Sequence, residues 1–300
     1  MSSATLSDAM LRAFSDEGYL LVEGALPPPV VAAVIDELDA AVDACSRDLR
    51  DRGQLEDPLE EHGFDTRLHR LSLRTDAVVR TLFNRNYMRP ALLELIRGPA
   101  LLDLLEPLLG PEIACHPGYR VRPKLPSSSP ISWMRAMPWH QDVAYLVPEC
   151  DRYFYATVWI PLTESTEENG CIEVLPRGHR GILPHRNVHG EPFLEILGEA
   201  LPPLESVKVP ARPGDVLLMS GLMPHRSGLN RTERVRWSLD LRYHAADVPP
   251  GYSGEPALLV RSRSRPEGVI RDCADVERLR EASPAVDAPR YRRWPTVHPT

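Results

Sequence analysis

Proline content is the feature that most constrains what this chain can fold into. The sequence has 31 prolines among 300 residues, which is roughly twice the average usage. Because proline breaks the hydrogen bonding of helix interiors and of central strands, this content argues against a long helical bundle. It indicates many short elements joined by sharp corners.

Charge and cysteine content narrow the class of protein. The 35 basic and 42 acidic residues give a net charge of −7, so the overall charge of the protein does not favour binding of nucleic acid. The five cysteines show no C-x-x-C spacing, which argues against a disulfide framework or structural zinc and suits a reducing compartment. No signal peptide is visible, and charged residues interrupt the leucine-rich region 91–109. We expect a cytoplasmic protein that acts on a small molecule, without nucleic-acid or membrane partners.

The first part of the chain, about residues 1–112, has the pattern of helices. Apolar residues recur there at three-to-four spacing, and Pro90 and Pro99 mark two further helix starts before the stop signal Gly110-Pro111. The expected elements are helices over 6–16 and 28–50, two helical pieces within 92–109, a short strand over 19–22 and a surface loop over 53–66.

From about residue 113 the pattern changes to short strands. Turn signals such as Asn169-Gly170 and Pro213-Gly214-Asp215 separate runs that are β-branched, aromatic or alternating. The expected strands cover 113–121, 155–162, 171–175, 216–219 and 235–243, with a loop over 122–132. Helices followed by many short strands predict one α+β domain with a β core over about 113–245 and an extension over about 246–300.

Two tripeptides combine a histidine with a carboxylate, His140-Gln141-Asp142 and His189-Gly190-Glu191. On a strand, residues i and i+2 share a face, so either pair can direct both groups to one metal. The apolar and aromatic flanks of His140 suit a rigid ligand better than the turn-rich surroundings of His189. Taken alone, an H-x-D tripeptide is equally consistent with an ordinary surface His and Asp.

A third histidine and an alternating strand follow later in the chain. His225 comes after a turn and a strand, and two histidines with one carboxylate are the ligand set of non-haem iron(II) oxygenases. The strand over 235–243 places four polar residues on one face: Arg236, Ser238, Asp240 and Arg242. Such a face suits a cavity for an anionic cosubstrate, because a guanidinium binds a carboxylate through two hydrogen bonds. An ordinary half-exposed strand is the alternative.

This order of motifs resembles the phytanoyl-CoA dioxygenase family. The resemblance rests on H-x-D, a distal histidine some eighty residues later and an arginine eleven residues beyond it, and it covers roughly residues 10–245. Supporting motifs are Trp139-His140-Gln141-Asp142, Glu168-Asn169-Gly170-Cys171 and His225-Arg226-Ser227-Gly228. One departure is Arg177-Gly178-His179, where the family often has Gly-Ser-His or Gly-Thr-His.

The resemblance implies a fold and a set of site residues. The fold is a double-stranded β-helix (jelly roll, cupin-like), a mainly β core in an α+β chain, with the N-terminal helices packed against it. The cofactor is iron(II), and 2-oxoglutarate and dioxygen are cosubstrates. The implied iron ligands are His140, Asp142 and His225. Arg236 would hold the distal carboxylate of 2-oxoglutarate, with Ser227 and Trp159 in contact with it and Lys124 or Arg120 nearby.

The resemblance also implies a dioxygenase reaction. We expect hydroxylation of an unactivated C–H bond of a small metabolite (a carboxylic acid, an amino acid or a natural-product intermediate), with release of succinate and carbon dioxide. The presence of Asp142 favours hydroxylation, because related halogenases usually have Gly or Ala at that position. Desaturation, epimerisation or ring formation at the same centre remain alternatives, as does a non-catalytic β-helix protein that binds an organic anion. No catalytic residue beyond the metal ligands and no substrate-binding residue is predicted.

Overall fold

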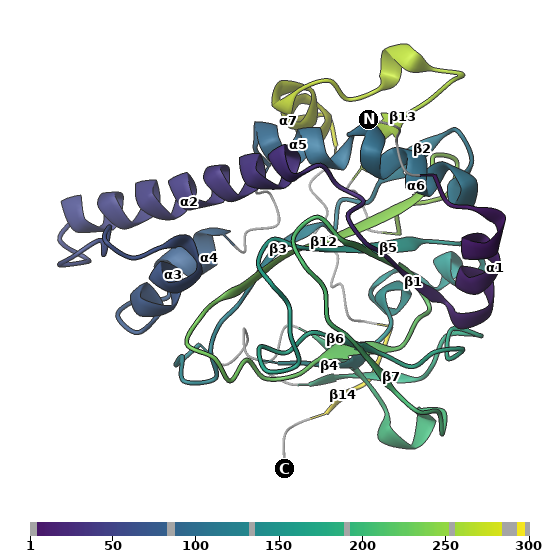
Figure 1. The fold of residues 1–300 in the computed structure, drawn as a ribbon. Helices are drawn as coiled ribbons and strands as arrows, with labels where there is room; N and C mark the ends of the chain where they lie inside the picture. The colour runs from purple at the N-terminus through teal and green to yellow at the C-terminus, as the bar shows by residue number, and fades with distance from the viewer. Residues whose placement is uncertain are drawn as a thin grey trace.

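Two antiparallel sheets form the body of the protein (Figure 1). The computed structural model describes residues 5–82, 88–131, 136–188, 193–251, 256–283 and 293–297. The larger sheet has the order β1-β10-β5-β12-β2-β13, with β3 also paired to β12, and the smaller sheet has the order β4-β11-β6-β9. Together they form the double-stranded β-helix that the family resemblance implied.

The strands are short, as the proline content requires. Those of the larger sheet are β1 (Tyr19–Val22), β2 (Ile113–Cys115), β3 (Arg120–Lys124), β5 (Ala156–Pro161), β10 (Val216–Ser220), β12 (Arg236–Ala245) and β13 (Leu258–Arg261). Those of the smaller sheet are β4 (Met137–His140), β6 (Ile172–Val174), β9 (Val207–Val209) and β11 (His225–Ser227). A third sheet contains β7 (His185–Val188), β8 (Leu194–Ile196) and β14 (Thr296–Val297).

Helices pack in one hydrophobic cluster with the larger sheet, and α2, α5 and α6 lie over one of its faces (Figure 1). They are α1 (Asp8–Glu17), α2 (Pro28–Asp51), α3 (Phe64–Ser72), α4 (Ala77–Leu82), α5 (Pro90–Ile96), α6 (Pro99–Leu109) and α7 (Cys273–Glu281). The predicted starts of α5 and α6 at prolines are confirmed, and Gly110 ends α6 with a φ of 80°. Among the described residues, no helix combines the length and the hydrophobicity that crossing a membrane requires.

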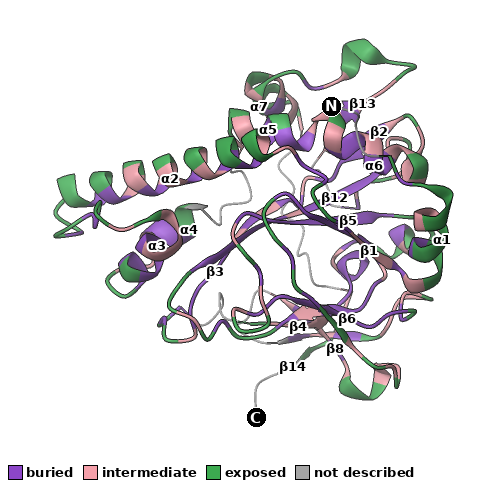
Figure 2. Cartoon of the chain, in the orientation of Figure 1, coloured by how far each residue is buried: buried purple, intermediate pink, exposed green. Residues whose placement is uncertain are grey.

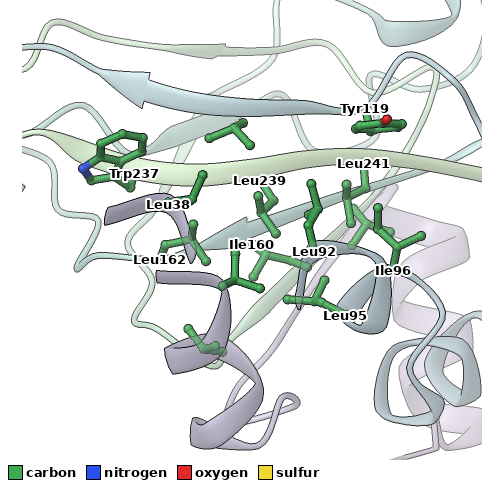
Figure 3. Close-up of a cluster of buried hydrophobic side chains, with 14 of the residues drawn as sticks. Leu38, Leu92, Leu95, Ile96, Tyr119, Ile160, Leu162, Trp237, Leu239 and Leu241 are labelled. Carbon is green, nitrogen blue, oxygen red and sulfur yellow. The ribbon is translucent and has the colours of Figure 1, made fainter. Parts of the chain in front are cut away.

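Every second side chain along β12 is apolar and packs against the helices. Trp237, Leu239 and Leu241 are completely buried, and they pack in one cluster with Leu38 of α2 and Ile96 of α5 (Figure 3). Burial of each such side chain contributes about 1.5–3 kcal/mol. Figure 2 shows β12 buried between its neighbours, whereas α2 keeps an exposed face. Since a slip of one residue would turn these side chains away from the core, this packing also fixes the opposite face of the strand.

Two expected loops are partly regular structure. The loop expected over 53–66 overlaps the start of α3 at Phe64, and the loop expected over 122–132 overlaps β3, which runs to Lys124. The strand expected over 113–121 is divided, because β2 pairs with the end of β12 and β3 pairs with its start. Pairing with one long strand, rather than local pattern, therefore decides where these two strands lie.

The turn that departs from the family pattern has a positive φ at a non-glycine residue. The Gly178 N–H donates to Leu175 O at 2.9 Å, and Arg177 between them has a φ of 65°. A turn with proline at its second position and a positive φ at its third normally has glycine there, which explains the family's preference. A Cβ on Gly178 would lie 3.2 Å from the ring of Pro224, so the turn packs against the residue before His225.

Replacing Arg177 with glycine should stabilise the protein. A non-glycine residue at this φ costs about 1 kcal/mol or more, of which glycine's greater freedom in the unfolded chain cancels a part. We expect Arg177→Gly to raise the free energy of unfolding by about 0.5–1 kcal/mol in urea denaturation. Arg177→Ala is the control, since it removes the same side chain but keeps a Cβ. Equal stability of the two variants would contradict the conformational explanation.

Candidate active site

Two histidines and one aspartate meet between the two sheets. His140 at the end of β4 is the register partner of His225 in β11, and their ring centroids are 4.1 Å apart. Asp142 Oδ1 lies 3.8 Å from His140 Nε2. All three residues are buried, and one potential ligand atom of each lies within 4.8 Å of the others. The structure thus brings together the three predicted ligands.

Backbone carbonyls orient both imidazoles. The Nδ1 atoms of His140 and His225 each lie 2.9 Å from the carbonyl oxygen two residues earlier, in Pro138 and Met223. Because a carbonyl oxygen only accepts, each Nδ1 carries a proton, so in the neutral imidazole the free lone pair is on Nε2. Burial, and then the nearby His225, hold the pKa of His140 well below its ordinary value. Both Nε2 atoms are therefore prepared to bind a metal.

Asp142 reaches the histidines from a turn. β4 ends at His140, and Asp142 is the first residue of the 3-10 helix η2 (Asp142–Tyr145). The expectation that His140 and Asp142 share one face of a strand is therefore wrong. The extended backbone of Gln141, with φ −120° and ψ 135°, carries the chain from the strand into this turn.

Two partners hold the carboxylate of Asp142. Thr157 Oγ1 donates to Oδ2 at 2.6 Å, and Arg242 Nη2 donates to Oδ1 at 2.5 Å. The Asp142 side chain is only 1% exposed, so burial by itself raises its pKa, whereas the Arg242 guanidinium and the two nearby histidines lower it, and the net pKa lies well below the ordinary value. The carboxylate is therefore ionised, as a metal ligand must be.

A cavity beside the histidines contains a buried arginine. His140, His225, Trp159, Ser227 and Arg236 all contribute to its lining. Arg236 is 3% exposed, its guanidinium lies 5.1 Å from the centre of the Trp159 ring, and burial lowers its pKa to about 10. Within the described part of the chain, its Nε and Nη1 have no hydrogen-bond partner. A buried cation with open donors is costly unless an anion completes its hydrogen bonds, so the cavity fits a carboxylate.

The two basic residues expected near the cosubstrate have different positions. Lys124 is the register partner of Arg236, lines the same cavity and donates from Nζ to Gly228 O at 2.7 Å. Arg120 is not among the lining residues, and its Nη1 donates to Tyr119 O at 2.6 Å. Of the other tripeptide considered, His189 and Glu191 lie outside the described residues.

Sequence reasoning missed the partners of Asp142. The alternation of the strand placed Arg242 on the polar face, but nothing local indicated that it would contact a residue one hundred positions earlier. Thr157 lies in a predicted strand and carries no sequence signal of its own. Its inward direction follows only from the pairing of β5 with β12, in which Thr157 is the register partner of Arg242.

Comparison with known proteins identifies the family. A family model described as phytanoyl-CoA dioxygenase matches residues 14–238. The chain belongs to this family. As a member of the phytanoyl-CoA dioxygenase family, it is a 2-oxoglutarate-dependent non-haem iron dioxygenase, with iron(II) as cofactor and 2-oxoglutarate and dioxygen as cosubstrates. The donor set of two imidazoles and one carboxylate fits this metal.

Individual relatives agree with this assignment. The chain is 28% identical to a probable alpha-ketoglutarate-dependent hypophosphite dioxygenase from Stutzerimonas stutzeri, with 84% of this chain and 85% of the relative covered. It is 25% identical to 1-deoxypentalenic acid 11-beta-hydroxylase from Streptomyces arenae, with 82% and 84% covered. A solved structure of the non-heme monooxygenase ThoJ in complex with nickel has the same fold, with a TM-score of 0.59, 22% identity and 90% and 94% coverage.

Removing the arginine that pairs with Asp142 should destabilise this phytanoyl-CoA dioxygenase family member strongly. Arg242→Met leaves a buried carboxylate without its counter-ion, which typically costs about 3–5 kcal/mol. The measurement is urea denaturation of the metal-free protein. Arg122→Met is the matched control, since Arg122 pairs at 3.3 Å with the less buried Asp240, and we expect its cost to be below about 1 kcal/mol. Similar losses in both variants would contradict a special role for Arg242.

Proposed function

We propose that this dioxygenase hydroxylates an unactivated C–H bond of a small anionic metabolite and releases succinate and carbon dioxide. In this proposal His140, Asp142 and His225 hold iron(II), and Arg236 binds the distal carboxylate of 2-oxoglutarate. Ser227 and Trp159, which line the same cavity, contact the cosubstrate. The observation that carries the proposal is the buried guanidinium of Arg236 with two open donor atoms in the cavity that the two histidines line.

The residues of the chain position the reactants and exclude water. Iron(II) with 2-oxoglutarate and dioxygen supplies the oxidising chemistry. The carbonyls of Pro138 and Met223 keep both imidazoles in the metal-binding tautomer, and Arg242 keeps Asp142 ionised. Three protein ligands leave open positions for the two cosubstrates, and the buried lining restricts competing reactions with water.

Charge in the cavity supports an anionic substrate. Basic side chains outnumber acidic ones in the lining: these are Arg122, Lys124, Arg226 and Arg236, against Asp240. Of the four, Arg122 pairs with Asp240, Arg226 pairs with Glu173, and burial lowers the pKa of Lys124 well below its ordinary value. Two relatives are named for hypophosphite and for 1-deoxypentalenic acid, both of which are anions at neutral pH. We therefore propose a carboxylic acid, an amino acid or an acidic natural-product intermediate as the substrate.

We also propose that residues 1–300 act as one oxygenase domain. β1, from the part that was expected to be helical, pairs with β10 of the core over about 113–245. β13, from the extension over about 246–300, pairs with β2. Both flanking parts therefore contribute strands to the larger sheet.

Substrate-dependent succinate formation tests the proposal. Protein loaded with iron(II) is given 2-oxoglutarate, dioxygen and a panel of acids, each beside its neutral amide. With an acid that is a substrate, we expect one succinate for each product molecule that has gained one oxygen atom. With the corresponding neutral amide, we expect neither product nor substrate-dependent succinate. A product that has lost two hydrogens would instead indicate desaturation or ring formation.

An aspartate substitution completes this test. Asp142→Ala should lower succinate formation to background, because it removes one of the three proposed iron ligands and leaves the buried Arg242 guanidinium without that partner. Asp103→Ala, on the outer face of α6 where Asp103 pairs with Arg261, is the control and should retain activity. Full activity of Asp142→Ala would overturn the assignment of the metal ligands.

A further inference from the structure

The C-terminal segment 293–297 contacts the turn that carries Asp142. This segment lies beyond the residues matched by the family model, which end at 238. Trp294 Nε1 donates to Ala144 O in η2 at 2.8 Å. Arg293 Nη1 donates to Leu146 O at 3.3 Å and to Asp151 Oδ1 at 2.8 Å. The carbonyl oxygens of Ala144 and Leu146 thus accept hydrogen bonds from the side chains of Trp294 and Arg293.

The same segment is attached to a strand of the third sheet. β14 pairs in parallel with β7, and the two lie together at the lower side of Figure 1. Asn187 of β7 donates from Nδ2 to Trp294 O at 2.7 Å and from its backbone N–H to Pro295 O at 2.8 Å. The position of Trp294 against the turn is therefore fixed by backbone pairing as well as by its own side chain.

His185 of β7 connects this segment to the metal ligands. Its ring centroid lies 5.1 Å from that of Trp294, and its Nδ1 donates to Leu183 O at 2.7 Å. Its Nε2 is therefore an acceptor, and it accepts the backbone N–H of Gln141 at 3.1 Å. The two ligand histidines use the same carbonyl arrangement, but the Nε2 of His185 is occupied by the residue between His140 and Asp142.

The side chain of Gln141 extends the connection to the other ligand strand. Gln141 is completely buried, and its Nε2 donates to Gly181 O at 2.8 Å and to Leu222 O at 2.6 Å. Its Oε1 accepts the Leu183 N–H at 2.7 Å. Leu222 lies three residues before His225. The Gln141 side chain therefore connects its own segment, which carries His140 and Asp142, to the segment before His225 and to residues 181–183, just before His185.

We propose that residues 293–297 form a C-terminal strap that sets the position of Asp142 relative to the two histidines, with Trp294 and His185 as positioning residues. A short 3-10 turn has poor hydrogen-bond geometry of its own, so contacts from outside decide where its side chains lie. Partners that orient a metal ligand typically change metal affinity by about 10–100-fold. This inference rests on the proposed role of Asp142 as an iron ligand.

Two substitutions of Trp294 test the strap. Trp294→Ala removes both the ring against His185 and the donor to Ala144, whereas Trp294→Phe keeps a ring and removes only the donor. The measurements are hydrogen exchange of the peptide over 141–147 in the metal-free full-length protein, and the Kd for iron(II) by anaerobic calorimetry. For Trp294→Ala we expect faster exchange in that peptide and a Kd about tenfold higher or more, with Trp294→Phe between it and the wild type.

Controls separate the strap from general stability. Exchange in β12 should be the same in all variants, and Arg278→Ala on α7 should change neither measurement. If Trp294→Ala fails to fold, Trp294→Phe provides the same comparison with the wild type. Unchanged exchange over 141–147 would overturn the proposal, and so would faster exchange with an unchanged Kd, because the strap would then not position the ligand. If the wild type binds no iron(II), the proposed function fails, while exchange in the metal-free protein still tests the contact.

Discussion

The buried carboxylate of Asp142 is the constraint on which the rest of the site depends. Removing such a charge from water costs several kcal/mol, and only good hydrogen bonds and an opposite charge compensate for it. Thr157 and Arg242 provide both from the inner faces of β5 and β12. Arg242 is in turn held in place because the other face of β12 is anchored by Leu239 and Leu241 against the helices. Packing against the helices thus fixes the register of β12, and this register places Arg242 beside Asp142.

β12 also carries Arg236, a buried cation whose hydrogen-bond donors the described protein atoms do not all satisfy. Arg236 is buried beside Trp159, with two donor atoms that have no partner in the described part of the chain. A fold selected for stability alone would not retain such a residue, because an apolar side chain would pack there at lower cost. The proposed binding of dianionic 2-oxoglutarate would give the residue a function, and the phytanoyl-CoA dioxygenase family uses this cosubstrate. Arg236 thus lowers the stability of the fold, and the proposed binding of the cosubstrate accounts for its presence in β12.

Local pattern predicted much of this structure, and long-range contact decided the rest. The two faces of β12 followed from strict alternation, and Pro90 and Pro99 marked helix starts, because both signals act within a few residues. The turn at Asp142 broke the expected alternation, since it depends on contacts made by Gln141 with segments forty and eighty residues away. The position of Trp294 on the same turn had no local signal at all. The sequence therefore indicated the residues that we propose as metal ligands, whereas the groups that orient them had no local signal.

The most direct test of this account is the affinity of the iron-loaded protein for 2-oxoglutarate, measured by anaerobic calorimetry with Arg236→Met beside the wild type. Loss of a buried, hydrogen-bonded charge partner costs about 2 kcal/mol or more, which corresponds to a Kd raised roughly thirtyfold or more. We expect this loss of affinity without any decrease in the free energy of unfolding of the metal-free protein. An unchanged Kd would contradict it, because Arg236 would then be a structural residue and the polar face of β12 would not be the cosubstrate site.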